Sequence, residues 1–312
     1  RYRIDGILRE ANKLPKKVLG ALVSRIKILS NLKIDERRAP QDGRFKIEVG
    51  GQVYALRVAT LPIVDGEKVA IRILNESAKP ATLAELGFWG KSLGDLEHAL
   101  AQPHGMVLVT GPTGSGKSTS LFSILTQLNK PSVNISTIED PVEYRINGAN
   151  QTQINVAAHM TFAAGLRALL RQDPNIIMVG EIRDSETATL AVQAALTGHL
   201  VFSTLHTNNA ATCLPRLLDM EIEPFLIAST VRAVVGQRLV RKLCKDCRVS
   251  YKPDSAMLAQ LNDVFRIDDE GALVLINKLE AQAKEGGVGE AEPLSSRPTE
   301  ILQLWGASED GC

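Results

Sequence analysis

Residues 111–118 read GPTGSGKS and constrain the fold more than any other segment of this 312-residue chain. They follow the apolar run 106–109, which is typical of a buried parallel strand, and they lead into a helical stretch that starts at Lys117. The segment matches the pattern G-x-x-x-x-G-K-[ST] in full. Its glycines let backbone N–H groups surround phosphates, and the N-terminus of the following helix adds positive potential. An ordinary glycine-rich turn is the alternative, but the flanking strand and helix favour a phosphate-binding loop.

The chemistry of such a loop gives its last residues separate roles. Lys117 is placed to reach the β- and γ-phosphates of a nucleotide, and the Ser118 hydroxyl is placed to ligate Mg²⁺. The residues expected to bind the nucleotide are Gly111, Pro112, Thr113, Gly114, Ser115, Gly116, Lys117, Ser118 and Thr119.

Composition excludes several other classes of protein. The chain has 36 Lys and Arg against 35 Asp and Glu, a net charge of +1, which argues against a strongly basic nucleic-acid surface but leaves room for a local basic patch. Aromatic residues make up 4%, too few for a stacking platform for single strands. No apolar run reaches the roughly 18 residues of a membrane span. Four cysteines do not make a disulfide scaffold. We therefore expect a cytosolic, mixed globular protein.

Hydrophobic patterning divides the chain in two. The first part combines a helical period with strand-like runs on both sides of Gly50-Gly51, which predicts a small α+β domain. The second part alternates apolar strands with helices, which predicts an α/β fold with a parallel sheet covered by helices. The expected divisions are the small domain at residues 1–76, a linker at 77–82 and the α/β domain at 83–312. The expected elements are helices at 15–32, 117–128, 161–172 and 185–196, strands at 46–49, 52–60, 68–74, 106–109, 133–138, 176–179 and 200–203, and a flexible insertion at 281–298.

Two glutamates follow buried strands, where a protein with this loop needs carboxylates. Glu181 ends an apolar run and takes the place of an acidic Mg²⁺ ligand, although Asp is more usual there. Glu139 follows the next strand after the loop's helix and is placed to orient or deprotonate an attacking water. A surface Glu is the competing interpretation for the first, and an ordinary Asp140-Pro141 turn for the second. At Glu139, the spacing alone favours neither the catalytic carboxylate nor the turn.

Two histidines and two arginines are weaker candidates. His199 and His206 bracket an apolar strand, and a His past the carboxyl end of a strand lies on the ligand face of an open α/β sheet. His206 is thus a candidate sensor of the γ-phosphate, although a lone His is more often structural. Arg57 and Arg72 each lie in a strand of the first domain, where an isolated Arg is usually solvated. They matter for catalysis only if that domain meets a bound nucleotide, because Arg stabilises transferring phosphate.

Cys244 and Cys247 form a C-x-x-C pair, which is half of a structural zinc site. Cys312 is the remaining nearby candidate ligand. A redox pair is one alternative, but no thioredoxin-like pattern surrounds these residues, and two unrelated thiols are the other alternative.

These motifs together resemble one family. The chain is similar to the secretion ATPase superfamily, in the branch of the type IV pilus assembly ATPases (PilB-like) and the type II secretion ATPases (GspE-like). The similarity extends from residue 1 to about residue 252 and is carried by RIDG at 3–6, PQDGR at 40–44, the loop at 111–118, EDPVE at 139–143, VGEIRD at 179–184, residues 197–208 from TGH to STLHTN, and QRLVRKLC at 237–244.

The resemblance implies a RecA-like P-loop domain preceded by a small PAS-like domain. It implies an Asp box at 138–143 with Glu139, a Walker B segment at 176–181 in which Glu181 is normal, and a His box at 197–208 with His206. Arg57 and Arg72 match the arginine fingers of the family. The family also implies homohexamers in which the first domain of one subunit packs on the ATPase domain of the next.

The cysteines fit one branch of the family better than another. A C-x-x-C favours the assembly and secretion ATPases over the retraction ATPases, which lack the zinc site. The branch implies a second C-x-x-C, so Cys312 is expected to open that pair, and residues from about 244 to form part of a zinc-type insertion. With neither an initiating Met nor a closing pattern, the chain is expected to be a fragment of a longer protein.

The resemblance therefore predicts a motor that hydrolyses Mg²⁺-ATP and powers type IV pilus assembly or type II protein secretion. ATP and Mg²⁺ are the expected cofactors, with Zn²⁺ in the full-length protein. The expected location is the cytoplasmic face of the inner membrane, peripheral to it, with a membrane platform protein as partner and no nucleic acid. Two alternatives remain: a RecA-like nucleic-acid translocase, and an ATP-binding regulator without turnover.

Overall fold

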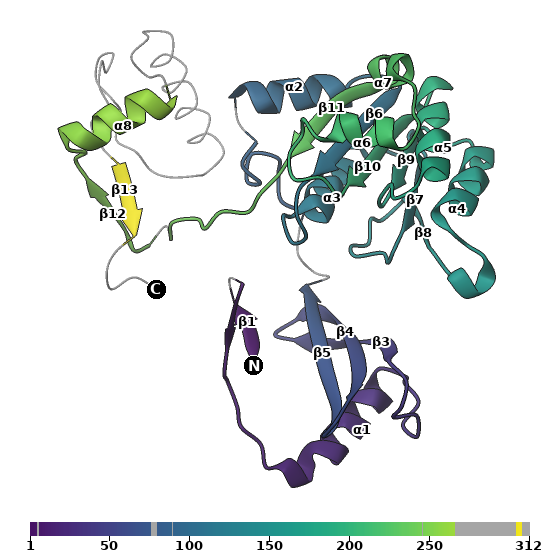
Figure 1. The fold of residues 1–312 in the computed structure, drawn as a ribbon, viewed down its shortest axis with the longest axis vertical. Helices are drawn as coiled ribbons and strands as arrows, with labels where there is room; N and C mark the ends of the chain where they lie inside the picture. The colour runs from purple at the N-terminus through teal and green to yellow at the C-terminus, as the bar shows by residue number, and fades with distance from the viewer. Residues whose placement is uncertain (5, 76–79, 89, 245, 266–303, 308–312) are drawn as a thin grey trace. The chain divides into compact units, whose positions relative to one another are not determined.

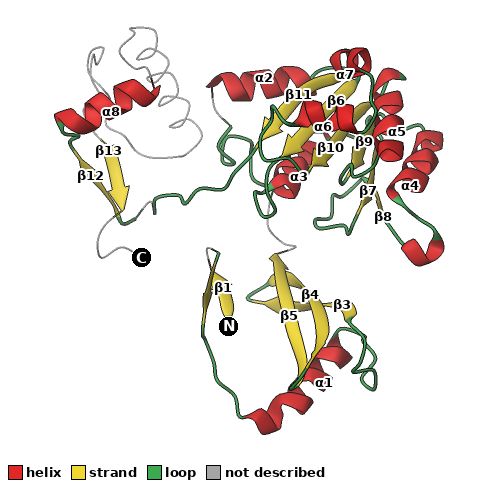
Figure 2. Ribbon diagram, in the orientation of Figure 1, coloured by secondary structure: helices red, strands yellow, loops and turns green. Residues whose placement is uncertain are grey.

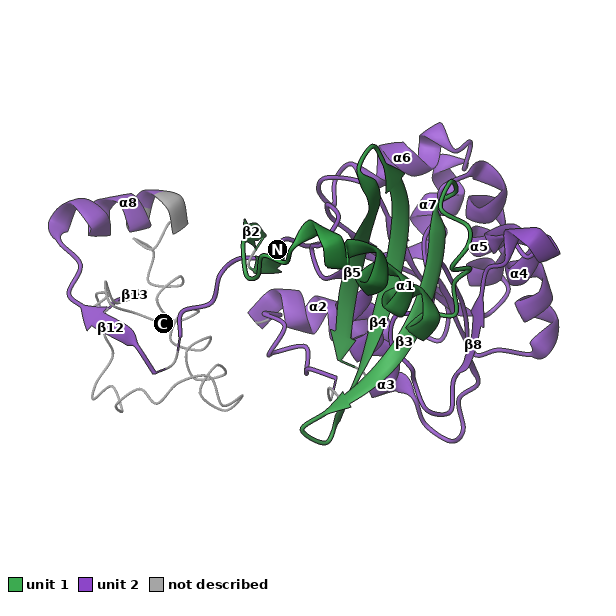
Figure 3. Cartoon of the chain, turned by 90° about the horizontal axis from the view of Figure 1, so that it is seen from below, with its two compact units in different colours: residues 1–79 green, residues 80–312 purple. Residues whose placement is uncertain are grey.

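The larger unit of the chain is built on a parallel sheet, as the alternation of apolar runs with helices predicts. The computed structural model describes residues 1–4, 6–75, 80–88, 90–244, 246–265 and 304–307. The chain divides into two units, residues 1–79 and 80–312, and each is described by itself below (Figure 3).

The first unit is built on an antiparallel sheet of order β3-β4-β5. Its strands are β3 (Gln41–Val49), β4 (Gln52–Ile63) and β5 (Gly66–Asn75). Gly50 and Gly51 join the first two strands with φ of 59° and 74°, the left-handed conformation that a two-residue hairpin loop requires. Helix α1 (Leu19–Leu29) follows the 3-10 turn η1 (Lys16–Val18) and packs on one face of the sheet. The hairpin of β1 (Tyr2–Ile4) and β2 (Ile7–Arg9) precedes them.

A buried ion pair ties α1 to the sheet. Lys27 of the helix and Glu67 of β5 are 1% and 7% exposed, and Nζ lies 2.5 Å from Oε1. The same ammonium donates a hydrogen bond to the backbone oxygen of Glu36 at 2.7 Å. Because a buried charge is costly without a partner, this pair fixes the helix against one place on the sheet.

The second unit contains a six-stranded parallel sheet (Figure 2). Its order is β11-β6-β10-β9-β7-β8, so strands from distant parts of the sequence are neighbours. Every residue of β6, β7, β9 and β10 is buried, as expected for a sheet covered on both faces. The strands are β6 (Gly105–Thr110), β7 (Ile135–Glu139), β8 (Asn150–Gln153), β9 (Ile176–Val179), β10 (Leu200–Leu205) and β11 (Val231–Gly236).

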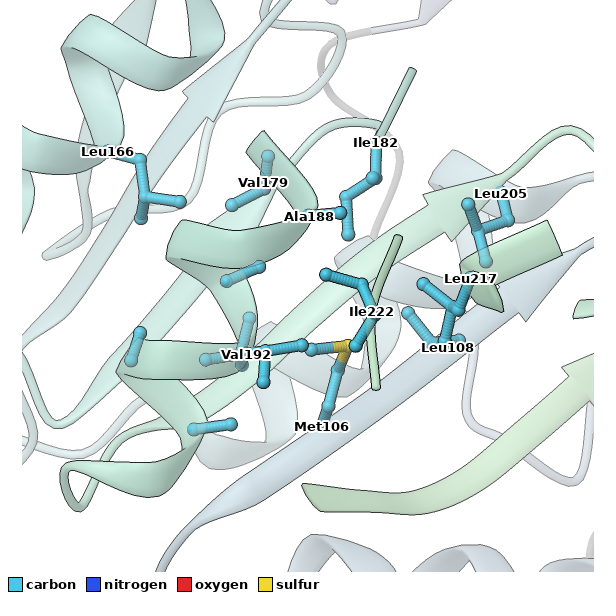
Figure 4. Packing of buried hydrophobic residues seen from close by; sticks show 14 of the residues in the cluster. Met106, Leu108, Leu166, Val179, Ile182, Ala188, Val192, Leu205, Leu217 and Ile222 are labelled. Atoms are coloured by element: carbon cyan, nitrogen blue, oxygen red, sulfur yellow. The ribbon is translucent and has the colours of Figure 1, made fainter. Parts of the chain in front are cut away.

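Helices cover both faces of this sheet and form two cores (Figure 1). Side chains alternate along β6: Met106 and Leu108 enter the core shown in Figure 4, whereas Val107 and Val109 enter the opposite one. The first core contains residues of α4 (Phe162–Leu169), α5 (Ser185–Leu196), α6 (Cys213–Asp219) and α7 (Pro224–Thr230), and the second contains residues of α2 (Gly90–Leu100) and α3 (Lys117–Leu128). The 3-10 turns η2 (Val156–Ala158) and η3 (Leu170–Gln172) flank α4.

Beyond the sheet, β12 (Arg248–Tyr251) pairs antiparallel with β13 (Leu304–Ala307), and α8 (Ser255–Phe265) follows β12. The guanidinium of Arg248 lies over the Trp305 ring, 4.4 Å from its centroid. None of the helices in the described ranges is both long and apolar enough to span a bilayer.

The predicted α/β fold class is confirmed, and each helix and strand expected from periodicity is present. Several other elements of the described chain were missed, namely β1, β2, α2, β8, α7, β11, β12, α8 and β13. Strand β8 reads NQTQ and carries no apolar signal, so only its pairing with β7 makes it a strand. The insertion expected at 281–298 lies outside the described residues.

Candidate nucleotide site

The loop at 111–116 connects the carboxyl end of β6 to α3, as the motif requires. Gly111 has φ of 146°, and a Cβ there would overlap the backbone oxygen of Gln237 and lie 2.7 Å from Oγ of Ser115. Gly116 has φ of 87° and lies against the amide of Gln237. Side chains are therefore disfavoured at both ends of the loop, as a loop whose backbone N–H groups approach a phosphate closely requires.

Lys117 and Ser115 show that this cradle suits an anion. Nζ of Lys117 donates hydrogen bonds to the backbone oxygens of Gly111, at 2.8 Å, and Pro112, at 3.0 Å. Burial lowers the pKa of Lys117, and the negative charge of Glu181 opposes that change. The hydroxyl of Ser115 is buried and has no hydrogen-bond partner among the described residues. A phosphate in the loop would give the Ser115 hydroxyl a partner, and would offer Lys117 a charged partner in place of two carbonyl oxygens.

Glu181 lies just past the end of β9 and meets two other side chains. Its Oε2 is 2.9 Å from Nε2 of His206, which lies just past β10, and its Oε1 accepts a hydrogen bond from Arg183 at 2.6 Å. That hydrogen bond raises the pKa of Arg183. The backbone around Glu181 is fixed because Thr204 of β10 donates its hydroxyl to the oxygen of Gly180 at 2.7 Å.

Glu139 ends β7 and is buried. Its Oε1 accepts hydrogen bonds from the Thr137 hydroxyl at 2.6 Å and the Gln151 amide at 3.0 Å. Burial raises the pKa of Glu139, and these two hydrogen bonds oppose the rise. Gln151 also donates to the backbone oxygen of Tyr144 at 2.9 Å, so it joins Glu139 to the loop that follows. Sequence reasoning missed Thr137 and Gln151, because neither lies in a motif.

Strand order explains why these groups meet. β6, β10, β9 and β7 are consecutive neighbours in one parallel sheet, so their carboxyl ends lie side by side. The loop, His206, Glu181 and Glu139 each follow or end one of these strands. This is the edge at which open α/β sheets bind ligands. His199 lies at the opposite edge, where its Nδ1 is 2.9 Å from the backbone oxygen of Ala194, which is a structural contact.

Gln237 is a further residue that sequence reasoning left without a role. Its backbone N–H donates to Thr110 at 2.9 Å, and its side-chain oxygen accepts the hydroxyl of Ser120 at 3.0 Å. It thus spans the loop from the end of β6 to α3. It also borders a cavity of about 400 Å³ whose lining includes Phe88, Leu96 and Val234.

The candidate metal ligands fall into two groups. Ser118 lies in the first turn of α3, and Glu181 offers carboxylate oxygens at the same sheet edge, which is the donor set that Mg²⁺ takes together with waters and phosphates. Cys244 and Cys247 are half-buried and form no disulfide, whereas Cys312 lies outside the described residues. Within the described ranges, no three His, Cys, Asp or Glu side chains gather as metal ligands. Zinc binding therefore stays a prediction.

Arg57 and Arg72 belong to the first unit, where they face each other directly across β4 and β5. Two residues 15 positions apart in sequence thus form one cross-strand pair, an arrangement that the sequence did not predict. Their role toward a nucleotide stays a prediction.

Comparison with known proteins shows the family. The profile of the family described as "Type II/IV secretion system protein" matches residues 1–286. The chain belongs to this family. The type II secretion system protein E of Pseudomonas aeruginosa is 52% identical over 261 residues, which cover 84% of this chain and 52% of that protein. The type II secretion system ATPase E of Vibrio cholerae is 52% identical over 254 residues, 81% of this chain and 50% of that protein. This family member therefore spans about half the length of these relatives.

Solved structures agree with this assignment. The pilus retraction motor PilT with bound ADP matches with a TM-score of 0.60 and 28% identity, covering 91% of this chain and 81% of that one. The ATPase DotB of Legionella pneumophila matches with a TM-score of 0.56 and 25% identity, covering 88% and 78%. The resemblance predicted from the motifs is thereby confirmed.

Proposed function

We propose that this chain hydrolyses Mg²⁺-ATP and forms the motor part of a type II secretion or type IV pilus assembly ATPase. The observation that carries the proposal is the convergence of the phosphate loop, His206, Glu181 and Glu139 at the carboxyl ends of four adjacent parallel strands. The relatives named above as type II secretion proteins, and the motor PilT, support the same choice.

Nucleotide binding would use residues 111–119 and the neighbouring cavity. The phosphates would take the place of the Gly111 and Pro112 carbonyls as partners of Lys117, and would receive the buried hydroxyl of Ser115. The cavity of about 400 Å³ is partly apolar. One of its lining residues is Gln237, which also contacts the loop. A nucleobase held there would lie next to phosphates held by the loop.

The metal and acid–base residues follow from the strand ends. Ser118 and Glu181 would hold Mg²⁺, which when bound neutralises charge on the phosphates. Glu139 and Glu181 share the tasks of ordering the metal and orienting the attacking water. His206 positions Glu181 through their shared hydrogen bond, and is placed to sense the terminal phosphate. Arg57 and Arg72 would act in trans on a nucleotide held by a second subunit.

Coupling to secretion would need a ring and a membrane partner. The chain is proposed to work as a homohexamer at the cytoplasmic face of the inner membrane, peripheral to it, against a platform protein that adds pilin or pseudopilin subunits. Closure of one subunit's arginines on the next subunit's nucleotide would couple hydrolysis to movement of the two units. Zinc would bind Cys244 and Cys247 together with further cysteine ligands, Cys312 among them.

The test is Mg²⁺-ATP hydrolysis by the whole chain at several protein concentrations, with and without single- and double-stranded DNA. The expected result is turnover that rises in specific activity with protein concentration, disappears in Lys117→Ala and ignores DNA. Strong stimulation by DNA would instead favour a nucleic-acid translocase. Nucleotide binding without any Lys117-dependent turnover would favour a regulator.

A further inference from the structure

Three arginines lie side by side in the first unit. The register of its sheet places Arg44 of β3 directly opposite Arg57 of β4, and Arg57 directly opposite Arg72 of β5. Directly paired residues of neighbouring strands project from the same face of a sheet. Adjacent strands are ~4.8 Å apart, so the row of Arg44, Arg57 and Arg72 spans about 10 Å across the whole sheet.

Gly43 fixes the face from which this row projects. A Cβ at Gly43 would overlap the backbone oxygen of Ser30 and lie 2.7 Å from Cδ2 of Leu32, both in the segment that follows α1. Gly43 therefore faces α1, and so does its partner Val58, which is 1% exposed. Because side chains alternate along a strand, Arg44 and the rest of the row project from the opposite, uncovered face.

The three aligned arginines lower the stability of the sheet that carries them. Like charges directly opposite one another destabilise a strand pair. Arg44 and Arg72 are exposed, and neither guanidinium has an ion pair or a side-chain hydrogen bond within the described part of the chain. Asp42 is the nearest carboxylate on the same face of β3, but its register partners are Ala59 and Ala70, so it stands in the next row. Three aligned guanidiniums thus favour an anion with several oxygens.

We infer that this row binds the terminal phosphates of ATP, with Arg44 as a third phosphate-binding arginine beside Arg57 and Arg72. The nucleotide is the one held by the phosphate loop of a second copy of this chain, so the inference rests on the proposed function. Planar guanidiniums bind phosphate oxygens in pairs, and a row of three covers a length that suits an extended polyphosphate. The net charge of +1 favours this ligand over a nucleic-acid backbone, which requires a broader basic surface.

The test compares Arg44→Ala, Arg44→Lys and Lys68→Ala in the whole chain. Lys68 is a matched control because it is exposed and projects from the same face of β5 as Arg72, but opposite Leu61 and outside the row. We expect Arg44→Ala to lower kcat for Mg²⁺-ATP hydrolysis about 10- to 100-fold, as loss of one charged hydrogen bond implies. Arg44→Lys should recover part of the loss, and Lys68→Ala should stay within about twofold of the parent.

Two further measurements separate the inference from simpler explanations. The affinity for Mg²⁺-ADP, which lacks the terminal phosphate, should be unchanged in Arg44→Ala, and the melting temperature should match that of Lys68→Ala. Equal kcat in Arg44→Ala and Lys68→Ala would overturn the inference while leaving the proposed function intact. Loss of labelled double-stranded DNA binding with unchanged turnover would assign the row to nucleic acid instead. Absence of Lys117-dependent turnover in the parent chain would overturn both.

Discussion

Nε2 of His206 lies 2.9 Å from Oε2 of Glu181, although the two residues are 25 positions apart in sequence. They meet because β10 and β9 are neighbours in the parallel sheet, and each residue lies just past the end of its strand. The other carboxylate oxygen of Glu181 is bound to Arg183, so two side chains fix its orientation. We therefore propose that His206 positions the carboxylate that would order Mg²⁺.

Replacing His206 should therefore lower turnover more than nucleotide binding. A hydrogen bond to a charged group contributes about 1.5–3 kcal/mol, so His206→Ala should reduce kcat about 10- to 100-fold. His206→Gln keeps an N–H donor and should lose less. The measurement is kcat and KM for Mg²⁺-ATP, and full activity in His206→Ala would show that the contact has no role in turnover.

The environment of Glu139 predicts a pH effect. Burial raises the pKa of Glu139 above 4.5, and hydrogen bonds from Thr137 and Gln151 oppose the rise. Gln151→Leu removes one of these donors, so the pKa should rise further and the acid limb of the kcat–pH profile should move to higher pH. The matched control is Gln153→Leu, an exposed residue of the same strand. Superimposable profiles for the two variants would contradict the proposal that the Glu139 carboxylate takes part in turnover.

The same pKa change has a consequence for stability. A carboxyl whose pKa is raised by folding binds its proton more tightly in the folded state, so stability falls as pH rises from 4.5 through the folded pKa. Glu139→Gln removes this cost and can still accept both hydrogen bonds at its amide oxygen. At pH 7 the variant should be at least as stable as the parent in urea unfolding while its ATP hydrolysis is lost.

Gly43 should tolerate no side chain. Its Cβ would overlap the backbone oxygen of Ser30, so Gly43→Ala should destabilise the first unit by about 1–3 kcal/mol, the usual cost of overpacking. Gly20, which lies in α1 with nothing within 4 Å of an added Cβ, gives the control Gly20→Ala. Chemical denaturation should show a loss for the first variant and none for the second.

The Lys27–Glu67 pair should be strongly coupled. Removing one partner leaves an uncompensated buried charge, so Lys27→Met or Glu67→Leu alone should cost about 3–5 kcal/mol. The double variant Lys27→Met/Glu67→Leu should recover much of that loss, because apolar residues of similar size replace both charges. Additive losses in this double-mutant cycle would show that the pair is not an energetic unit.

Sequence reasoning was reliable where local pattern and packing agree. The apolar runs at 106–109, 176–179 and 200–203 became central strands because a buried parallel strand needs apolar residues on both faces. Strand β8 was missed because its polar residues form a strand only through their register with β7. Gln151 and Gln237 were missed for a related reason: each acts through contacts that depend on strand order.

The arginines show the same limit of sequence reasoning, because their arrangement depends on strand register. Arg57 and Arg72 were singled out from family motifs, but their direct opposition, and the place of Arg44 in the same row, depend on the register of three strands. A shift of one residue would send Arg44 to the covered face, and the close approach of Gly43 to Ser30 and the burial of its partner Val58 exclude that shift.

The central claim is that each site combines the phosphate loop of one subunit with arginines of another. The most direct test mixes two inactive variants, Lys117→Ala and Arg72→Ala, and measures Mg²⁺-ATP hydrolysis. In a randomly mixed equimolar ring, about a quarter of the sites would pair an intact loop with an intact arginine, so about a quarter of the parent activity should return. If the mixture hydrolyses ATP no faster than the average of the two variants alone, the sites are not shared and the account is wrong.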